Sequence, residues 1–268
     1  MTLRPRRAGV LGSPIEHSRS PQLHLAAYRA LGLTEWTYDR IECTGDQLPG
    51  VVSGFGPEWV GVSVTMPGKI AALRFADDAT PRARLIGSAN TLVRSAGGWR
   101  ADNTDIDGVI GALAGLTPRR AMVIGSGGTA PAAVVGLIDL GAAHITVAAR
   151  SAQKAAVLVD LAVRCGVQAD FCDIAVDLAA AVADVDVVVN TVPADAVAPY
   201  ASALAAVPVL LDAIYDPWPT PLAAAVGEAG GRVVSGLQML LNQAYTQVEQ
   251  FTGRPAPKQA MAAALEAG

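Results

Sequence analysis

The stretch Ile124-Gly125-Ser126-Gly127-Gly128-Thr129-Ala130 lies between a short apolar segment and a segment of helical length. Gly125, Gly127 and Ala130 match the G-x-G-x-x-G/A pattern of dinucleotide-binding turns. The first glycine allows a tight turn, the second lets the backbone approach a pyrophosphate, and a small third residue lets the helix pack on the strand. N–H groups at the helix start then face the phosphates. A plain tight turn is the alternative, but the flanking strand and helix favour a dinucleotide site that includes Gly128 and Thr129.

The end of the next predicted strand bears on which dinucleotide binds. An NAD site usually places Asp or Glu there, about 20 residues after the glycines, to hold the ribose 2′-hydroxyl. Here His144–Ala149 runs into Arg150 and Ser151, with Lys154 one helical turn later. A guanidinium suits a bidentate hold on a 2′-phosphate. We therefore expect NADP rather than NAD, held by these three residues, with a solvated helix start as the alternative for the two cations.

The second half of the chain alternates apolar and helical segments, which is typical of a parallel sheet covered on both faces. The predicted strands are Ala121–Ile124, Ile145–Ala149, Val185–Asn190 and Val209–Ala213. The predicted helices are Thr129–Leu140, Lys154–Arg164, Pro221–Ala229 and Leu237–Phe251, before a final Ala-rich helix. We expect an α/β protein with a Rossmann-type doubly wound domain over residues 104–236 and another domain over residues 1–103. Periodicity alone leaves open which domain the C-terminal helices, residues 237–268, join.

The first third also alternates strands and helices, so we expect a second α/β domain. Its predicted strands are Ala8–Leu11, Trp36–Ile41, Val60–Val64 and Asn90–Arg94. A helix is predicted over Pro21–Leu31, with Ser20 as its N-cap and the proline at its first position, where a missing N–H costs nothing.

Composition narrows the class of protein. At roughly 150 residues per domain, 268 residues suffice for one large domain or two modest ones. A net charge of −4 argues against a general nucleic-acid or acidic-lipid binder. Because 51% of the residues are apolar and only 16% are charged, the chain is not disordered.

The sequence also argues against a metalloprotein, a membrane protein and a secreted protein. The cysteines Cys43, Cys165 and Cys172 are too scattered for a disulfide framework, and three histidines add little to a zinc site, so we expect no metal. No apolar run follows the basic residues of the N-terminus, so no signal peptide is expected. The uncharged Ala121–Ile138 contains four glycines and a proline, which argues against a membrane span. We expect a cytoplasmic protein with no membrane or nucleic-acid partner.

Lysine is rare in this chain, which holds 3 lysines and 17 arginines. Lys69 follows the predicted strand Val60–Val64 and the turn Thr65–Gly68, which would place it at the carboxyl end of that strand. An ammonium can donate a proton in catalysis, whereas a guanidinium effectively cannot. Lys69 is therefore a candidate proton donor, with a surface lysine as the alternative.

The segment Ala101–Gly108 is dense in polar residues. Its spacing resembles the start of an EF-hand loop, but Ala114 stands at the twelfth position, where calcium needs Glu, so calcium is not expected. Asn103 or Thr104 can cap the helix that follows. Further polar side chains could hydrogen-bond a polyhydroxy acid, although caps and turns explain each one alone; they are Ser18, Ser20, Asn90 and Thr91.

Six blocks of sequence occur together and in a fixed order along nearly the whole chain. They are GSPIEHSRSP at 12–21, VTMPGK at 64–69, GSANT at 87–91, DNTD at 102–105, DAIYDPWPTP at 212–221 and GLQMLLNQA at 236–244. The set resembles the signature blocks of the shikimate dehydrogenase family. That resemblance implies reversible reduction of 3-dehydroshikimate to shikimate with NADPH in aromatic amino-acid biosynthesis. It also implies that the N-terminal domain binds the substrate and that the final helices return to it.

The resemblance assigns roles to individual residues. Lys69 and Asp105 would transfer the proton, because a protonated lysine stabilises a developing alkoxide while the carboxylate orients the amine and the reacting hydroxyl. Ser18 and Ser20 would bind the substrate carboxylate. The remaining substrate contacts would come from Thr65, Asn90, Gln243 and, nearby, Tyr215, and we expect Thr191 and Gly236 to contact the cofactor.

The sequence departs from the family pattern in three places. Ser63 stands where the family often has Asn, which shortens one reach toward the substrate. Pro131 replaces a common Arg after the glycine loop, and only Arg150 is fully kept from the family's Asn-Arg-Thr-x-x-Arg clamp. The last two departures weaken the expected hold on the adenosine phosphate.

Two other functions remain open on the sequence. A quinate/shikimate dehydrogenase shares most of these blocks but uses NAD, against which Arg150 without a neighbouring carboxylate argues. A nucleotide sensor or scaffold on a dehydrogenase fold is the other, and the presence of Lys69 and Asp105 argues against it. The expected assembly is a monomer or a homodimer.

Overall fold

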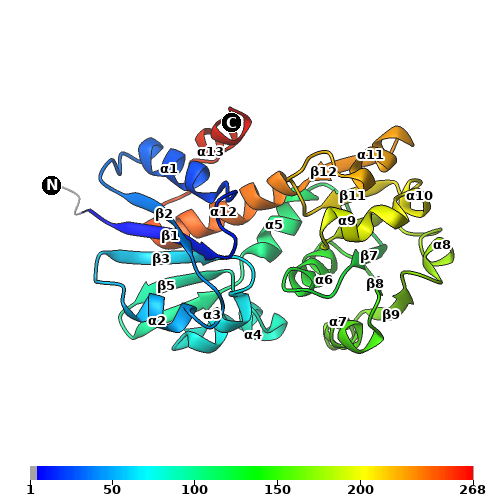
Figure 1. Ribbon diagram of the computed structural model, residues 1–268, viewed down its shortest axis with the longest axis horizontal. Helices are drawn as coiled ribbons and strands as arrows, with labels where there is room; N and C mark the ends of the chain where they lie inside the picture. Colours follow the sequence, from blue (N-terminus) through cyan, green and yellow to red (C-terminus); the bar gives the residue numbers. More distant parts are fainter. Residues whose placement is uncertain (1–4, 268) are drawn as a thin grey trace. The chain divides into compact units, whose positions relative to one another are not determined.

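The computed structural model describes residues 5–267, which divide into two compact units (Figure 1). The first unit contains the described residues up to Thr104 and those from Leu240 onward. The second unit is Asp105–Met239. Each unit contains a six-stranded sheet with helices packed against it, so the α/β prediction is confirmed.

The sheet of the first unit has the strand order β2-β1-β3-β5-β6-β4. Its strands are β1 (Arg7–Gly12), β2 (Thr37–Glu42), β3 (Trp59–Val64), β4 (Asp78–Ala79), β5 (Thr91–Ser95) and β6 (Gly98–Asp102). β1 pairs in parallel with both β2 and β3, whereas β5 pairs antiparallel with β3 and with β6. The four predicted strands all form, and β4 and β6 are additional. β6 lacked a recognisable pattern because Trp99 is its one large apolar residue.

The helices of the first unit include four short ones and the C-terminal pair. They are α1 (Ser20–Ala30), α2 (Leu48–Ser53), α3 (Lys69–Phe75), α4 (Pro81–Ile86), most of α12 (Gly236–Thr252) and α13 (Lys258–Glu266). α13 packs beside α1 (Figure 1), so the C-terminal helices return to the N-terminal unit as the resemblance implied.

The predicted N-cap of α1 is wrong by one residue. Arg19 is the N-cap, and Ser20 is the first residue of the helix. The reason is that the first backbone hydrogen bond of the helix is accepted by the Arg19 carbonyl, from the Leu23 N–H (3.4 Å). The proline after Ser20 still occupies the first turn, as its missing N–H predicts.

The sheet of the second unit is entirely parallel and has the order β12-β11-β10-β7-β8-β9. Its strands are β7 (Arg120–Ile124), β8 (His144–Ala149), β9 (Gln168–Asp173), β10 (Val187–Asn190), β11 (Val209–Asp212) and β12 (Arg232–Ser235). The two strands that the sequence did not indicate, β9 and β12, are the edge strands. Both are partly exposed and carry polar residues, so neither reads as a continuous apolar run.

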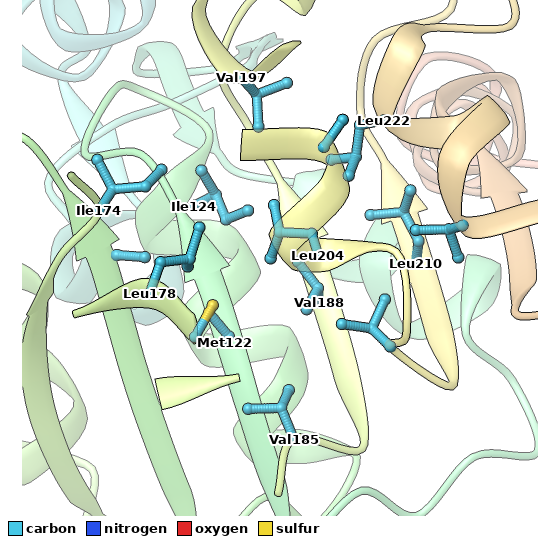
Figure 2. Close-up of a cluster of buried hydrophobic side chains, with 14 of the residues drawn as sticks. Met122, Ile124, Ile174, Leu178, Val185, Val188, Val197, Leu204, Leu210 and Leu222 are labelled. Atoms are coloured by element: carbon cyan, nitrogen blue, oxygen red, sulfur yellow. The ribbon is translucent and has the colours of Figure 1, made fainter. Parts of the chain in front are cut away.

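Helices and one 3-10 turn cover this sheet. They are α5 (Asp105–Ala112), α6 (Ala130–Asp139), α7 (Ala152–Arg164), α8 (Leu178–Ala181), α9 (Ala194–Val197), η1 (Ala198–Tyr200), α10 (Ala201–Leu204) and α11 (Pro221–Glu228). Figure 2 shows the core on one face of the sheet, where Met122, Ile124 and Val188 meet Leu178, Leu204 and Leu222. Burial of such side chains is worth about 1.5–3 kcal/mol each. Within residues 5–267, no helix has both the length and the apolar character needed to cross a membrane.

Candidate active site

Lys69 begins α3 at the carboxyl end of β3, as predicted. The turn that lifts it there is held by two backbone hydrogen bonds, from the Thr65 N–H to the Leu11 carbonyl (2.8 Å) and from the Gly68 N–H to the Thr65 carbonyl (2.9 Å). The Lys69 carbonyl accepts a hydrogen bond from the Ala89 N–H (2.9 Å), so its backbone is joined to the segment just before β5. Lys69 is only 9% exposed, so it is not an ordinary surface lysine.

Asn90, Thr104 and Gln243 form one buried hydrogen-bonded group in the first unit. The Asn90 Nδ2 donates to Thr104 Oγ1 (3.0 Å) and to Gln243 Oε1 (3.2 Å). The Thr104 N–H donates to Asn90 Oδ1 (2.7 Å). The structure therefore brings together two predicted substrate-binding amides that lie 153 positions apart in the sequence. Asp105 follows Thr104 by one peptide bond and is the first residue of α5, where it is buried.

The chain leading to Asp105 is anchored by Asp102. Its carboxylate accepts hydrogen bonds from Arg82, Thr80 Oγ1 (2.6 Å) and Gln250 Nε2 (2.6 Å). Burial raises the pKa of the Asp102 carboxyl, but the hydrogen bonds and the Arg82 charge outweigh it and lower the pKa to about 2. Asp102 stays ionised near neutral pH and holds the start of the DNTD segment.

Ser18 and Ser20 lie at and just before the start of α1. The Arg40 guanidinium donates to the Ser18 carbonyl through Nε (2.9 Å) and Nη2 (2.6 Å), which fixes the preceding loop. The same loop is held by Glu42, which accepts from Ser13 Oγ (2.5 Å) and from a backbone N–H (3.1 Å). Ser18 is half-buried and Ser20 is buried.

Ser63, the first departure from the family pattern, lies in a buried polar group. Its hydroxyl is 2.6 Å from the Tyr38 hydroxyl and donates to Gln247 Oε1 (2.7 Å). Gln247 was not predicted as a functional residue. Its position four residues after Gln243 on one helix was the available signal, because residues four apart share a helix face.

The glycine loop of the second unit has the shape that a dinucleotide needs. Gly125 has φ +105°, and a Cβ there would lie 2.5 Å from Val192 Cγ1 and 2.7 Å from Thr191 Oγ1. A Cβ on Gly127 would meet nothing within 4 Å, so that backbone faces open space where a pyrophosphate can approach. α6 starts at Ala130, so the positive end of its helix dipole lies beside this loop. The residues present therefore fit a dinucleotide.

Arg150 and Lys154 are exposed near the start of α7. Neither is ion-paired with a carboxylate in the described part of the chain, so both can face an anion. Ser151 is the N-cap of α7, and its hydroxyl accepts from the Lys154 N–H (3.4 Å). Asp173 ends β9 in register with Ala149, but its carboxylate accepts from the N–H of residue 175 (3.0 Å) within its own turn.

An unpredicted carboxylate, Asp212, holds the loops after β10 and β11. It is fully buried and accepts from Asn190 Nδ2 (2.9 Å) and Thr220 Oγ1 (2.6 Å). Thr191 follows Asn190, and its hydroxyl donates to the Ile124 carbonyl (2.7 Å), so it can only accept from a bound cofactor.

Tyr215 and Gly236 lie beside the same carboxyl end of the sheet. Tyr215 is half-buried in the loop after β11, whose start is fixed by a bond from the N–H of residue 214 to Asp212 (3.1 Å). Gly236 begins α12, and a Cβ there would collide with the Ala213 carbonyl. The backbone of α12 therefore approaches β11 as closely as only glycine permits.

A hollow of about 510 Å³ lies elsewhere in this unit, at the amino ends of β7 and β10. It is lined by residues 116–120 with Asp186 and Val187. The glycine loop is at the carboxyl ends of the strands, where ligands of open α/β sheets bind, so this hollow is separate from the candidate cofactor site. Among residues 5–267, no group of three His, Cys, Asp or Glu side chains could hold a metal ion.

Three family models match successive parts of the chain. The shikimate dehydrogenase substrate binding domain matches residues 10–92, the shikimate / quinate 5-dehydrogenase model matches residues 111–205, and the shikimate 5′-dehydrogenase C-terminal domain matches residues 236–266. The chain belongs to the shikimate dehydrogenase family. The family prediction is thereby confirmed, and so is the predicted combination of a substrate-domain fold with a Rossmann-type fold.

Curated relatives and solved structures of shikimate dehydrogenases match this chain over nearly its whole length. The shikimate dehydrogenase (NADP(+)) of Shouchella clausii is 32% identical, with 96% of each chain covered. The crystal structure of Mycobacterium tuberculosis shikimate dehydrogenase has 70% sequence identity and a TM-score of 0.96, covering 98% of this chain and 100% of that chain. The shikimate 5-dehydrogenase of Thermus thermophilus, in complex with NADP(H) and shikimate, has 28% identity and a TM-score of 0.83, covering 98% and 99%.

Proposed function

We propose that this protein reversibly reduces 3-dehydroshikimate to shikimate with NADPH, the first unit binding the substrate and the second the cofactor. Full-length relatives named shikimate dehydrogenase (NADP(+)) support the reaction and the cofactor. The observation that carries the proposal is the buried group of Asn90, Thr104 and Gln243, to whose segment the Lys69 backbone is bonded. These side chains offer amide and hydroxyl groups to a polyhydroxylated ring.

Lys69 and Asp105 perform the proton transfer in this proposal. Bound NADPH supplies the hydride. As the ketone becomes an alkoxide, the Lys69 ammonium stabilises the developing charge and donates its proton to that oxygen. Asp105 accepts hydrogen bonds from the amine and from the reacting hydroxyl, so both stay aligned. In the direction of oxidation, Lys69 takes the proton back from the hydroxyl.

Other residues of the first unit orient the substrate. The hydroxyls of Ser18 and Ser20 hold its carboxylate, and Thr65, Asn90 and Gln243 hold its ring oxygens. We also assign Tyr215 to substrate binding. An analogue that lacks one ring hydroxyl leaves one buried amide or hydroxyl of the protein without its partner in the complex. That loss costs about 1–3 kcal/mol of binding free energy, so the analogue binds more weakly than the substrate.

The second unit holds the cofactor through backbone and cations. The loop from Gly125 to Ala130 takes the pyrophosphate, and Arg150, Ser151 and Lys154 take the 2′-phosphate. Thr191 and Gly236 would also contact the cofactor. Because Pro131 sits in the first turn of α6, this part of the loop supplies no guanidinium, and Arg150 is the principal contact for the 2′-phosphate.

The proposal is tested by measuring the formation of reduced cofactor (NADPH or NADH) with shikimate or quinate as substrate and NADP or NAD as cofactor, at matched concentrations. We expect turnover with shikimate and NADP and little with the other three pairs. Turnover of quinate with NAD would identify a quinate dehydrogenase instead, and inactivity with all four pairs would reject catalysis. We further propose that the enzyme acts in the cytoplasm as a monomer or homodimer, which light scattering of the purified protein distinguishes.

A further inference from the structure

A chain of buried hydrogen bonds runs through the first unit to Asn90, which is assigned to the substrate ring. The Tyr38 hydroxyl of β2 lies 2.6 Å from Ser63 Oγ of β3. Beyond Ser63 the chain continues through Gln247 and Thr91 to Asn90. It therefore joins two strands of the sheet and α12 to a residue that is assigned to the substrate ring.

Gln247 is the centre of this chain, and every hydrogen-bonding position of its amide is used. Its Oε1 accepts from Ser63 Oγ (2.7 Å) and from His24 Nε2 (3.3 Å). Its Nε2 donates to Thr91 Oγ1 (2.9 Å) and to the Asn90 carbonyl (3.2 Å). The side chain is 1% exposed, so water cannot substitute for any of these partners.

His24 agrees with this assignment of donors and acceptors. Because Gln247 Oε1 can only accept, the proton of the neutral imidazole lies on Nε2, and the unpartnered Nδ1 is a bare acceptor. Burial lowers the pKa of His24 to about 3, although its hydrogen bond with Gln247 raises it, so the ring is neutral at ordinary pH. It also stacks on Tyr38 at 4.0 Å between ring centroids, which holds both rings in place.

Thr91 transmits the orientation of Gln247 to Asn90. Since its oxygen accepts from Gln247 Nε2, its single hydrogen is directed to Asn90 Oδ1 (2.8 Å). The Thr104 N–H donates to the same Oδ1 (2.7 Å). A flipped Asn90 amide would place its NH2 against two donors. Its Nδ2 is therefore held toward Gln243 Oε1.

We propose that Gln247 and Thr91 are positioning residues for shikimate, which fix the Asn90 amide in the one orientation that presents its NH2 group on the side of Gln243. This inference rests on the proposed function, because it takes Asn90 and Gln243 as the residues that bind the substrate ring. Neither Gln247 nor Thr91 contacts the substrate. Their effect is on the affinity for shikimate, through the preorganised direction of one amide.

The test compares Thr91→Val with Thr91→Ser. Valine keeps the shape of threonine and removes the hydroxyl, whereas serine keeps the hydroxyl and removes a methyl group. The control is Val248→Ala, which leaves a cavity at the fully buried neighbour of Gln247 on the same helix but removes no hydrogen bond. Gln247→Met breaks the same chain from the other end. The measurements are the shikimate Kd of the cofactor-free protein by calorimetry, the NADP Kd, and kcat and KM.

Thr91→Val and Gln247→Met should each weaken shikimate binding roughly tenfold, the effect of losing one buried hydrogen-bond partner, while the NADP Kd stays unchanged. Thr91→Ser should recover most of the affinity, and Val248→Ala should keep it despite a lower melting temperature. The double variant Thr91→Val/Gln247→Met should bind shikimate about as tightly as the single variant with the lower affinity, because both substitutions break the same chain of hydrogen bonds.

Equal shikimate Kd values for Thr91→Val and wild type would overturn the positioning role. Equal losses of shikimate affinity in Thr91→Val, Thr91→Ser and Val248→Ala would also overturn it, because they would indicate a purely structural effect. Failure of the proposed function looks different, because wild-type protein would then bind no shikimate at all.

Discussion

The Arg82 guanidinium donates two hydrogen bonds to the Asp102 carboxylate, from Nε to Oδ1 (2.7 Å) and from Nη2 to Oδ2 (2.6 Å). Asp102 is 3% exposed and the Arg82 side chain 28%, so the carboxylate of this ion pair is shielded from water. Asp102 also accepts from the backbone N–H of Asn103 (2.8 Å). The pair therefore fixes the strand end from which Thr104 and the proposed catalytic Asp105 follow.

This ion pair predicts a stability change in acid. The pKa of Asp102 is lowered from 3.8 to about 2 on folding, so its stabilising contribution is complete above the unfolded pKa and is lost as pH falls through the folded pKa. The contribution is about 2 kcal/mol. Asp102→Asn should remove it, so urea unfolding should show the variant less stable at pH 7 and closer to wild type near pH 2.

The matched control for that experiment is Asp78→Asn. Asp78 pairs with Arg84 at 2.7 Å, but both side chains are more than 60% exposed. An exposed pair contributes about 0–1 kcal/mol, so this variant should unfold nearly as wild type does at every pH. If the two variants lost equal stability at pH 7, the shielding of the Asp102 pair would have no energetic consequence.

The two glycines of the phosphate loop should respond differently to alanine. Gly127→Ala places a methyl group in open space, so the melting temperature should hardly change while NADP affinity falls because the methyl occupies the approach of the pyrophosphate. Gly125→Ala must adopt φ +105° and meet Val192, so it should destabilise the fold itself by about 1–3 kcal/mol. Calorimetry with NADP and thermal unfolding separate the two effects. Unchanged NADP affinity in Gly127→Ala would reject this loop as the pyrophosphate site.

Selection of NADP over NAD should depend on Arg150. Arg150→Ala should raise the KM for NADPH roughly tenfold, because a charge-assisted contact with the 2′-phosphate is lost, and should leave the KM for NADH nearly unchanged. Arg164→Ala, an exposed arginine in the last turn of the same helix, serves as control and should alter neither KM. A constant ratio of the two KM values in Arg150→Ala would assign the selection to another residue.

Much of the fold was predictable because buried parallel strands leave a plain pattern. β7, β8, β10 and β11 are short apolar runs, and each was expected within about two residues of its bounds. The edge strands β9 and β12 were missed because partly exposed strands mix polar and apolar residues without a clear period. β6 was missed because Trp99 is its one large apolar residue. The cap of α1 was misplaced by one residue because the Arg19 carbonyl, and not that of Ser20, accepts the first hydrogen bond of the helix.

For the candidate site, motifs indicated which residues matter but not how they are held. The glycine loop and Lys69 follow directly from their neighbours in sequence. The pairing of Asn90 with Gln243 depends on a helix more than a hundred residues away, and no local pattern indicates it. The supporting residues Arg82, Gln247 and Asp212 were not predicted. Polar residues recur at 243, 247 and 250 of α12, on one face of the helix, and this spacing was the one signal of a buried polar stripe.

The central claim is that Lys69 supplies the proton to a substrate held in the first unit. The most direct test is kcat for shikimate oxidation by Lys69→Ala beside wild type, with the NADP Kd measured on the same preparations. We predict a fall in kcat of about 10²–10⁴-fold with an unchanged NADP Kd and melting temperature. Lys69→Arg should not restore the rate, because a guanidinium keeps its proton. A Lys69→Ala enzyme within a few fold of the wild-type kcat would contradict the account.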